Sequence, residues 1–251
     1  MTPLKLILNA DDFGLCPGVN YAITDCLDNG RISSATMMMN MPGTDHAVKL
    51  AKTHKLKAIG VHFVLTAGIP FTEAASLRGP DGRFFSQAEF WGKKLEVQDI
   101  REELQAQLVA FLKEGLKPSH FDSHHHVHRH PLVWEVLKEM ADTVGAPIRD
   151  PLNNELPGQS SYVKCRLNQE FYGKLSLKSL TEILEKNENE EWLEVMCHPG
   201  YADAFLLKSS SYTLERVRET EILLSEEFGE MLAEKRVIVK TYTSLTMEEM
   251  A

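Results

Sequence analysis

The stretch that decides the fold is Leu4-Lys5-Leu6-Ile7-Leu8-Asn9-Ala10-Asp11-Asp12-Phe13-Gly14. Its first half is a short apolar run typical of a buried strand, and it then changes abruptly to acids and glycine. Similar short apolar runs recur along the chain, and most are followed by a helical pattern. Strands that alternate with helices in this way predict a parallel sheet of the α/β class.

We expect seven strands, over residues 4–9, 34–40, 58–65, 118–122, 147–150, 192–198 and 237–242. The helices expected between and after them cover residues 17–27, 45–53, 97–114, 131–144, 169–174, 177–186 and 213–228. No break in composition marks a linker, so residues 1–251 are predicted to form a single domain. The architecture that fits this length and order is a parallel (β/α) barrel, or an irregular, partly open variant of one.

Two long segments, 66–85 and 151–165, interrupt this alternation and are expected to be loops. The first is too long for an ordinary connection and follows a strand, so it could be a lid or a substrate-binding element. A disordered insertion is the alternative, but the aromatic residues Phe71, Phe84 and Phe85 argue against disorder.

Composition limits the partners and the compartment. The net charge is −9 and no stretch is densely basic, which argues against nucleic acid or a membrane surface as a partner. No apolar run approaches the roughly 20 residues that span a bilayer, and residues 1–5 lead directly into the first strand, so we expect no signal peptide. Four cysteines without a CxxC pair are typical of reduced thiols in a cytoplasmic protein.

Chemically active side chains follow the expected strands at their ends. Sites in parallel α/β folds lie at the carboxyl ends of the strands, where loops from several strands meet. The residues found there are Asp11, Asp12, Asn40, His62, Asp122, His124, Arg149 and His198. Carboxylates and imidazoles gathered in one place predict a divalent-metal site suited to hydrolysis.

Adjacent Asp11 and Asp12 repel each other, so the pair is best tolerated where a cation neutralises one of them. In an extended segment their side chains point in opposite directions, so one could bind metal and the other could serve as general base. An acidic turn or a helix cap before Gly14 is the alternative.

Residues 124–128 contain four histidines in five positions, more than packing requires. In an extended chain His124, His126 and His128 would share one face, whereas in a helix His124 and His128 would converge. His124 is favoured as a metal ligand in both cases, because it is nearest the strand end. Whether His126 or His128 also binds metal stays open, as does a purely structural role for the cluster.

Three further residues have more than one possible role. His62 could be a hydrogen-bonded core histidine, although its position near the carboxyl end of a strand favours a role as metal ligand. His198 could be a fourth ligand, a strand-end cap or a catalytic acid, and we favour the acid because three ligands leave open positions for water and substrate. Arg149 could orient a carboxylate, bind substrate or form a surface ion pair.

Four motifs in this order resemble the YdjC-like carbohydrate deacetylases, a family that includes the chitooligosaccharide (diacetylchitobiose) deacetylases. They are Asn9-Ala10-Asp11-Asp12-Phe13-Gly14, Gly60-Val61-His62-Phe63, Asp122-Ser123-His124-His125-His126-Val127-His128 and Cys197-His198-Pro199-Gly200-Tyr201. The resemblance implies a TIM-barrel-like fold related to the polysaccharide deacetylases, a divalent cation usually taken as magnesium, and a homodimer. By motif, Asp12, His62 and His124 would bind the metal, Asp11 would be the base and His198 the acid.

We therefore expect a metal-dependent hydrolase that acts on the linear amide C–N bond of acetylated amino-sugar oligosaccharides such as diacetylchitobiose. In this mechanism Arg149 would hold Asp11, and aromatic residues of the first long loop could stack on sugar rings. Two imidazoles and a carboxylate suit zinc, manganese or iron better than magnesium. Another metal-dependent hydrolase on the same barrel, such as a phosphoesterase, and a non-catalytic sugar-binding protein remain the alternatives.

Overall fold

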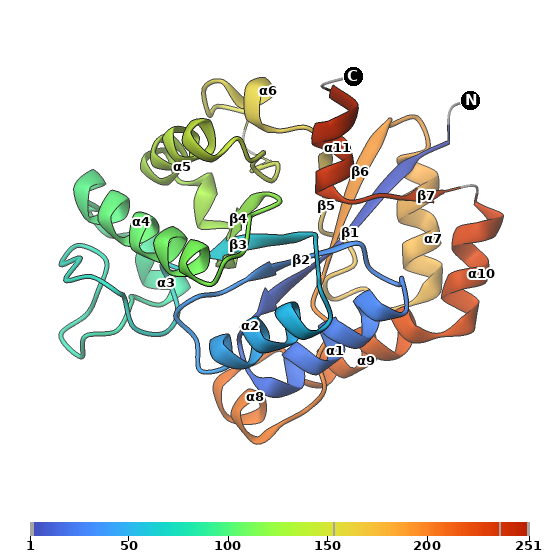
Figure 1. The fold of residues 1–251 in the computed structure, drawn as a ribbon, viewed down its shortest axis with the longest axis horizontal. Coiled ribbons are helices and arrows are strands. Elements are labelled where there is room, and N and C mark those ends of the chain that lie inside the picture. The colour runs from blue at the N-terminus through green and yellow to red at the C-terminus, as the bar shows by residue number, and fades with distance from the viewer. Residues whose placement is uncertain (1–2, 153, 236, 250–251) are drawn as a thin grey trace.

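A computed structural model describes residues 3–152, 154–235 and 237–249. The strands are β1 (Lys5–Phe13), β2 (Ser34–Met37), β3 (Ile59–Phe63), β4 (Phe121–Ser123), β5 (Arg166–Asn168), β6 (Trp192–Cys197) and β7 (Ile238–Val239). Every pairing between these strands is parallel. Helices surround the curved sheet on its outside (Figure 1).

The longer helices are α1 (Pro17–Asp28), α2 (Thr44–Thr53), α4 (Val97–Lys113), α5 (Pro131–Val144), α7 (Leu177–Lys186), α9 (Leu214–Leu224), α10 (Glu226–Glu234) and α11 (Tyr242–Glu249). Shorter helices are α3 (Gln87–Phe90), the 3₁₀ helix η1 (His124–Arg129), α6 (Gln159–Tyr162) and α8 (Ala204–Ser209). No helix among the described residues is long and apolar enough to cross a membrane.

The sheet is a partly open barrel with β1 near its middle. Its strand order is β4-β3-β2-β1-β6-β5, and β7 also pairs with β1. The β7 and β2 strands occupy successive parts of one β1 edge, because Lys240 N–H bonds to the Leu6 carbonyl and Ser33 N–H to the Leu8 carbonyl. No hydrogen-bonded ladder joins β4 to β5 among the described residues. The predicted parallel α/β barrel, in its partly open form, is therefore confirmed.

Burial explains why the central strands are apolar runs rather than alternating ones. In β1 every residue after Lys5 is buried, and all residues of β2 and β3 are buried. Strands that are covered on both faces lose contact with water on both, so both faces favour apolar side chains. Polar residues that lie on these strands consequently need partners, and they mark the site described below.

The predicted strand at 147–150 is wrong. Ile148 forms only an isolated parallel bridge to Phe121, and β5 lies later in the chain. Prolines at positions 147 and 151 lack the N–H groups that a longer ladder would need. The bridge nevertheless brings Arg149 beside β4, because its backbone N–H donates to the Phe121 carbonyl at 2.9 Å.

Two predicted helices are also wrong. Residues 169–174 form turns instead of a helix, and Gly173 has a φ of 80°, which an α-helix does not accommodate. The helix expected over 213–228 is broken into α9 and α10. Ser225 between them is extended, and its side chain accepts a hydrogen bond from Phe228 N–H to cap the second helix.

The two long connections differ in structure. Residues 66–85 are irregular apart from one antiparallel bridge between Arg78 and Phe84. This segment packs on α4, where the buried Glu103 carboxylate accepts from the backbone N–H groups of Phe71 and Thr72. The segment 151–165 contains the short helix α6. All four cysteines are buried and free.

Candidate active site

The two adjacent aspartates lie at a bulge near the end of β1. The pairing of β1 with β2 shifts register between Ala10 and Phe13, and Asp12 has a φ of 69°. A bulge inserts an extra residue into one strand and redirects its side chain, often beside an active site. Gly14 then turns the chain with a φ of 102°, at a place where a Cβ atom would lie 2.6 Å from the Met38 carbonyl oxygen. This close approach explains the glycine that ends the motif.

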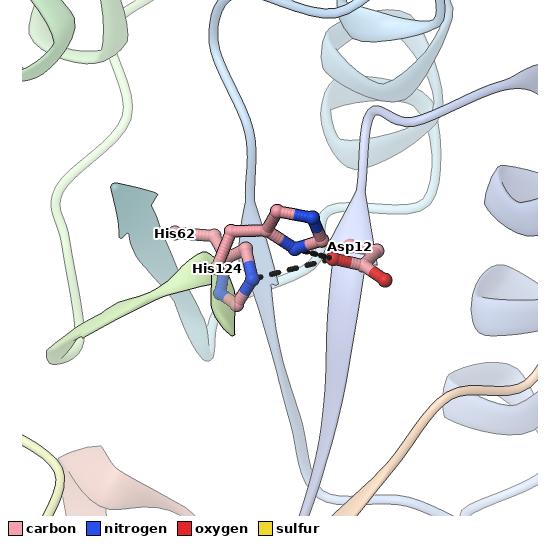
Figure 2. Close-up of side chains that lie close together, drawn as sticks. All are labelled: Asp12, His62 and His124. Atoms are coloured by element: carbon pink, nitrogen blue, oxygen red, sulfur yellow. Dashed lines mark hydrogen bonds and ion pairs between the residues drawn. The ribbon is translucent and has the colours of Figure 1, made fainter. Parts of the chain in front are cut away.

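Asp12, His62 and His124 meet at the carboxyl ends of β1, β3 and β4 (Figure 2). Asp12 Oδ1 is 3.3 Å from His62 Nε2 and 2.9 Å from His124 Nδ1. One donor atom from each residue lies within 4.8 Å of the others, as a shared metal ion requires. The three residues predicted to bind metal are therefore brought together.

The hydrogen bond behind His62 also suits a metal-binding role for this histidine. His62 Nδ1 lies 2.8 Å from Asp122 Oδ1, so a proton on Nδ1 leaves the Nε2 lone pair facing Asp12. A carboxylate behind a metal-binding histidine is the usual way to fix its tautomer. Burial alone would lower the pKa of His62, but Asp122 and Asp12 raise it to about 10. The surrounding carboxylates thus favour positive charge at this position, which a bound cation would supply.

Asp12 is held on its other side by an arginine that the sequence did not single out. Arg216, on α9, places Nη2 2.5 Å from Asp12 Oδ2. Burial alone would raise the pKa of Asp12, but His124 and Arg216 hold it well below its usual range. Asp12 is therefore a carboxylate with one oxygen bound to a guanidinium and the other facing two imidazoles.

Asp11 has a different environment, centred on Arg149. The Arg149 Nη1 and Nη2 atoms each lie 2.6 Å from an Asp11 oxygen, and the same guanidinium contacts Asp122 at 2.8 Å and Glu194 at 2.7 Å. Burial would raise the pKa of Asp11, but Arg149 lowers it strongly. Asp11, His62 and Asp122 also lie close enough to hold an ion, but Arg149 already supplies the positive charge between the two aspartates. Arg149 thus orients Asp11, and the ion pair between them is buried, not at the surface.

Behind Arg149 the network reaches the C-terminal helix. Glu194, on β6, accepts a hydrogen bond from the Tyr242 hydroxyl of α11, and both side chains are buried. The Tyr242 ring stacks on His120 with a centroid distance of 3.7 Å. The helix α11 therefore closes this side of the site, next to β5 and β6 (Figure 1).

His198 lies at the end of β6, with Nε2 4.0 Å from Asp11 Oδ2. Its backbone N–H donates to Glu219 on α9, and its Nδ1 is buried without a hydrogen-bond partner among the described residues. Burial lowers the pKa of His198 to about 4, even though Asp11 acts in the opposite direction. His198 is therefore neutral near pH 7, and it faces the same space as Asp11.

The other histidines of the run at 124–128 have separate roles. This run forms η1, in which His125 and His126 adopt φ values of 54° and 52°. His125 Nδ1 lies 2.9 Å from Thr66 Oγ1, and His128 Nδ1 lies 2.6 Å from Ser123 Oγ. Within the described parts of the chain, His126 and His128 belong to no group with metal-binding geometry. The left-handed turn, which neither an extended nor a helical prediction anticipated, packs the His125 ring 3.8 Å from the His124 ring and leaves His126 and His128 outside the group around Asp12.

All six predicted site residues therefore lie in one cluster, and several others complete it. The residues that the sequence did not assign to the site are Asp122 as the partner of His62, Glu194, Arg216, Glu219 and Tyr242. Of these, Glu194 could have been found from the sequence, because a carboxylate inside an apolar strand needs a buried partner.

Comparison with known proteins assigns the family. Residues 5–234 match the family described as YdjC-like protein. The chain belongs to the YdjC-like family. A carbohydrate deacetylase of Geobacillus stearothermophilus is 40% identical over 96% of this chain and 97% of its own length. A carbohydrate deacetylase of Vibrio parahaemolyticus is 39% identical over 96% of both chains.

Two solved structures are similar to this chain in fold. A structure from Enterococcus faecalis, described as a cellobiose-phosphate cleavage protein, has a TM-score of 0.91 and 30% identity over 97% of this YdjC-like chain and 99% of its own. A mutant of a CE4-family pseudoenzyme, with restored activity, has a TM-score of 0.52 and 15% identity, covering 98% of this chain and 68% of its own. This second likeness shows a similar fold and nothing further.

Proposed function

We propose that this YdjC-like protein is a metal-dependent deacetylase that removes the N-acetyl group from short amino-sugar oligosaccharides such as diacetylchitobiose. Its relatives support an acetylated sugar as the substrate. The observation that carries the metal-dependent chemistry is the meeting of Asp12, His62 and His124 within 4.8 Å, beside the facing pair Asp11 and His198 at 4.0 Å.

In this proposal Asp12, His62 and His124 hold a divalent cation. When bound, the cation would polarise the acetamide carbonyl and lower the pKa of water. The family resemblance favours magnesium, whereas two imidazoles and one carboxylate favour zinc or manganese. Asp122 keeps the lone pair of His62 Nε2 directed at the ion, and Arg216 fixes the orientation of Asp12.

Asp11 is proposed as the base and His198 as the acid. Asp11 has a lowered pKa and is therefore a weak base toward ordinary water. It would need a water molecule whose own pKa is already lowered. The water proton goes to Asp11 as the water oxygen attacks the carbonyl carbon. As the C–N bond breaks, a proton must reach the nitrogen, because an amide anion is too basic to leave. His198 starts neutral, so it would take up the proton that Asp11 received from water and then donate it to the sugar nitrogen as the C–N bond breaks.

The alternatives are less well supported. A phosphoesterase would need free cationic groups, but the buried guanidiniums of Arg149 and Arg216 are already bound by carboxylates. A sugar-binding protein without activity would not need the Asp11–Arg149 arrangement beside the metal-binding residues. A homodimer and a cytoplasmic location stay predictions, the first from the family resemblance and the second from the four buried free cysteines.

The decisive experiment measures acetate released from diacetylchitobiose by the metal-loaded enzyme. We expect release that stops with a chelator and returns with added Zn²⁺, Mn²⁺ or Mg²⁺. His124→Ala should lose both the metal and the activity. The matched control is His54→Ala, because His54 also pairs with a carboxylate, Asp28, but at the surface. Stoichiometric metal in His124→Ala, measured by mass spectrometry, would contradict the ligand assignment.

The same assay with diacetylchitobiose carrying a 6-phosphate would show whether the sugar is phosphorylated in the preferred substrate. No acetate from either sugar, with metal bound, would refute the proposed function.

A further inference from the structure

The proposed chemistry restricts where the sugar can lie. In deacetylation the acetyl group departs and the nitrogen stays on the sugar ring. The acid that protonates this nitrogen must therefore lie against the ring that carries it. If His198 is that acid, the surface beside His198 is the surface that the sugar ring contacts. This inference rests on the proposed function.

The surface beside His198 is made of two tyrosines. Tyr172 and Tyr212 stack with a centroid distance of 4.4 Å and an angle of 18° between their planes. The His198 ring is 5.4 Å from Tyr172 and 5.8 Å from Tyr212, nearly perpendicular to both. A ring almost equally distant from two stacked rings lies at the edge of the stack and not on its outer face. Neither Tyr212 nor His198 therefore covers the outer face of Tyr172.

Exposure agrees with this geometry. Tyr172 is 51% exposed, although it lies in the turns just after β5 and directly beside a histidine of the site. Aromatic side chains at the surface lose apolar contact with water when a flat, partly apolar ligand covers them. A pyranose ring has such a face, formed by its C–H groups.

The stack is also held in place by the groups that hold His198. Tyr212 donates its hydroxyl proton to Glu219 Oε1 at 2.6 Å, and Glu219 accepts the backbone N–H of His198 with its other oxygen. Glu219 is fully buried, and burial raises its pKa to about 7. One buried carboxyl group thus fixes both Tyr212 and His198, so Tyr172 rests on a support that is positioned relative to the acid.

We propose that the outer face of Tyr172 is the stacking platform for the sugar ring that carries the reacting N-acetyl group. The platform is preformed, so the sugar gains stacking without the cost of ordering a loose side chain. Tyr172 is accordingly a substrate-binding residue that favours a pyranose over a ring-free acetamide. Its hydroxyl has no part in this role.

The test compares kinetic constants of Tyr172→Ala, Tyr172→Phe and Tyr21→Ala with those of the metal-loaded wild-type enzyme. Tyr21 is a matched control on α1, because it is also 51% exposed and also contacts a histidine edge-on, His46 at 4.8 Å. Tyr172→Ala should raise KM for diacetylchitobiose about tenfold with kcat nearly unchanged. Tyr172→Phe should restore KM to within about twofold of wild type, because the aromatic face is kept.

A second measurement separates lost stacking from a distorted site. Acetamide carries the acetyl group but no ring, so its inhibition constant should be the same in all four proteins. An unchanged KM in Tyr172→Ala, or an inhibition constant for acetamide that rises together with KM, would refute the proposal that Tyr172 is the stacking platform.

Direct binding keeps this outcome distinct from failure of the proposed function. If the wild-type enzyme released no acetate, calorimetry with chitobiose would still test the platform. Weaker chitobiose binding in Tyr172→Ala but not in Tyr21→Ala would support stacking without deacetylation. Equal binding in both variants would reject it.

Discussion

Asp122→Asn is the sharpest test of how the protein prepares His62 for a metal. The two oxygens of Asp122 serve different donors: Oδ1 lies 2.8 Å from His62 Nδ1, and Oδ2 lies 2.8 Å from Arg149 Nη1 and accepts from Thr36 Oγ1 at 2.9 Å. Asparagine has the same shape but only one oxygen. One of the two nitrogen donors must therefore face an NH₂ group in the variant.

In the metal-bound state His62 would be a neutral imidazole, so the charged Arg149 will attract the remaining oxygen more strongly than His62 does. The asparagine NH₂ group then faces His62 Nδ1, which must become an acceptor, and the imidazole proton moves to Nε2. Nε2 is the atom directed at Asp12 and the proposed ion, so the ligand lone pair is lost. Loss of such a hydrogen-bond partner typically lowers metal affinity about 10- to 100-fold. We expect the upper end, about 2.7 kcal/mol, because the tautomer itself is reversed.

The assay is competition for Zn²⁺ between the protein and a chromophoric chelator at constant pH. Glu194→Gln is the matched control, since Glu194 is equally buried and contacts the Arg149 guanidinium at 2.7 Å but has no hydrogen bond to His62 among the described contacts. Its Zn²⁺ affinity should stay within about twofold of wild type. Unchanged affinity in Asp122→Asn would refute the tautomer argument, and an equal loss in both variants would assign the effect to Arg149 instead.

Three further predictions concern neighbouring parts of the site. Asp11→Asn should bind metal almost normally but lose about 10²- to 10⁴-fold in acetate release, and retained turnover would remove Asp11 from the role of base. Tyr242→Phe removes the hydroxyl that donates to Oε2 of buried Glu194, and urea unfolding should show a loss of about 1–3 kcal/mol in the free energy of unfolding; an unchanged midpoint would mean that Oε2 finds a replacement donor. Gly14→Ala should destabilise the protein more than Gly30→Ala, because both have positive φ but only Gly14 lacks space for a Cβ. Equal melting temperatures in the two alanine variants would contradict that steric account.

The sequence was sufficient to predict which polar side chains meet, because strand ends in a parallel sheet must share one edge. That rule alone placed Asp11, His62 and His198 together, although they are separated by long stretches of chain. It worked even where local structure was predicted wrongly. Arg149 does not end a strand, yet a single bridge to Phe121 brings it to the same edge.

The partners of these residues could not be predicted in the same way. Arg216 and Glu219 lie on α9, where charged residues usually face water, and nothing in a helical pattern indicates that Arg216 is 4% exposed and Glu219 fully buried. Their burial results from the way α9 packs near the end of β1, which is a tertiary contact. Tyr172 was missed for a related reason, because the prediction gave its segment to a helix and sought sugar-stacking residues in the first long loop.

Arg149 and Arg216 together explain how two adjacent buried aspartates can coexist. Each carboxylate has its own guanidinium, at 2.6 Å for Asp11 and 2.5 Å for Asp12, and an unpaired buried charge would otherwise cost several kcal/mol. Asp11 has both oxygens bound by Arg149, whereas Asp12 has one oxygen bound and the other directed at His62 and His124. The bulge that separates the two side chains therefore leaves two identical residues with different numbers of oxygens that are not bound by an arginine. Because only Asp12 directs an oxygen at both imidazoles, this arrangement supports the proposal that Asp12 binds the metal and that Asp11 exchanges protons with water.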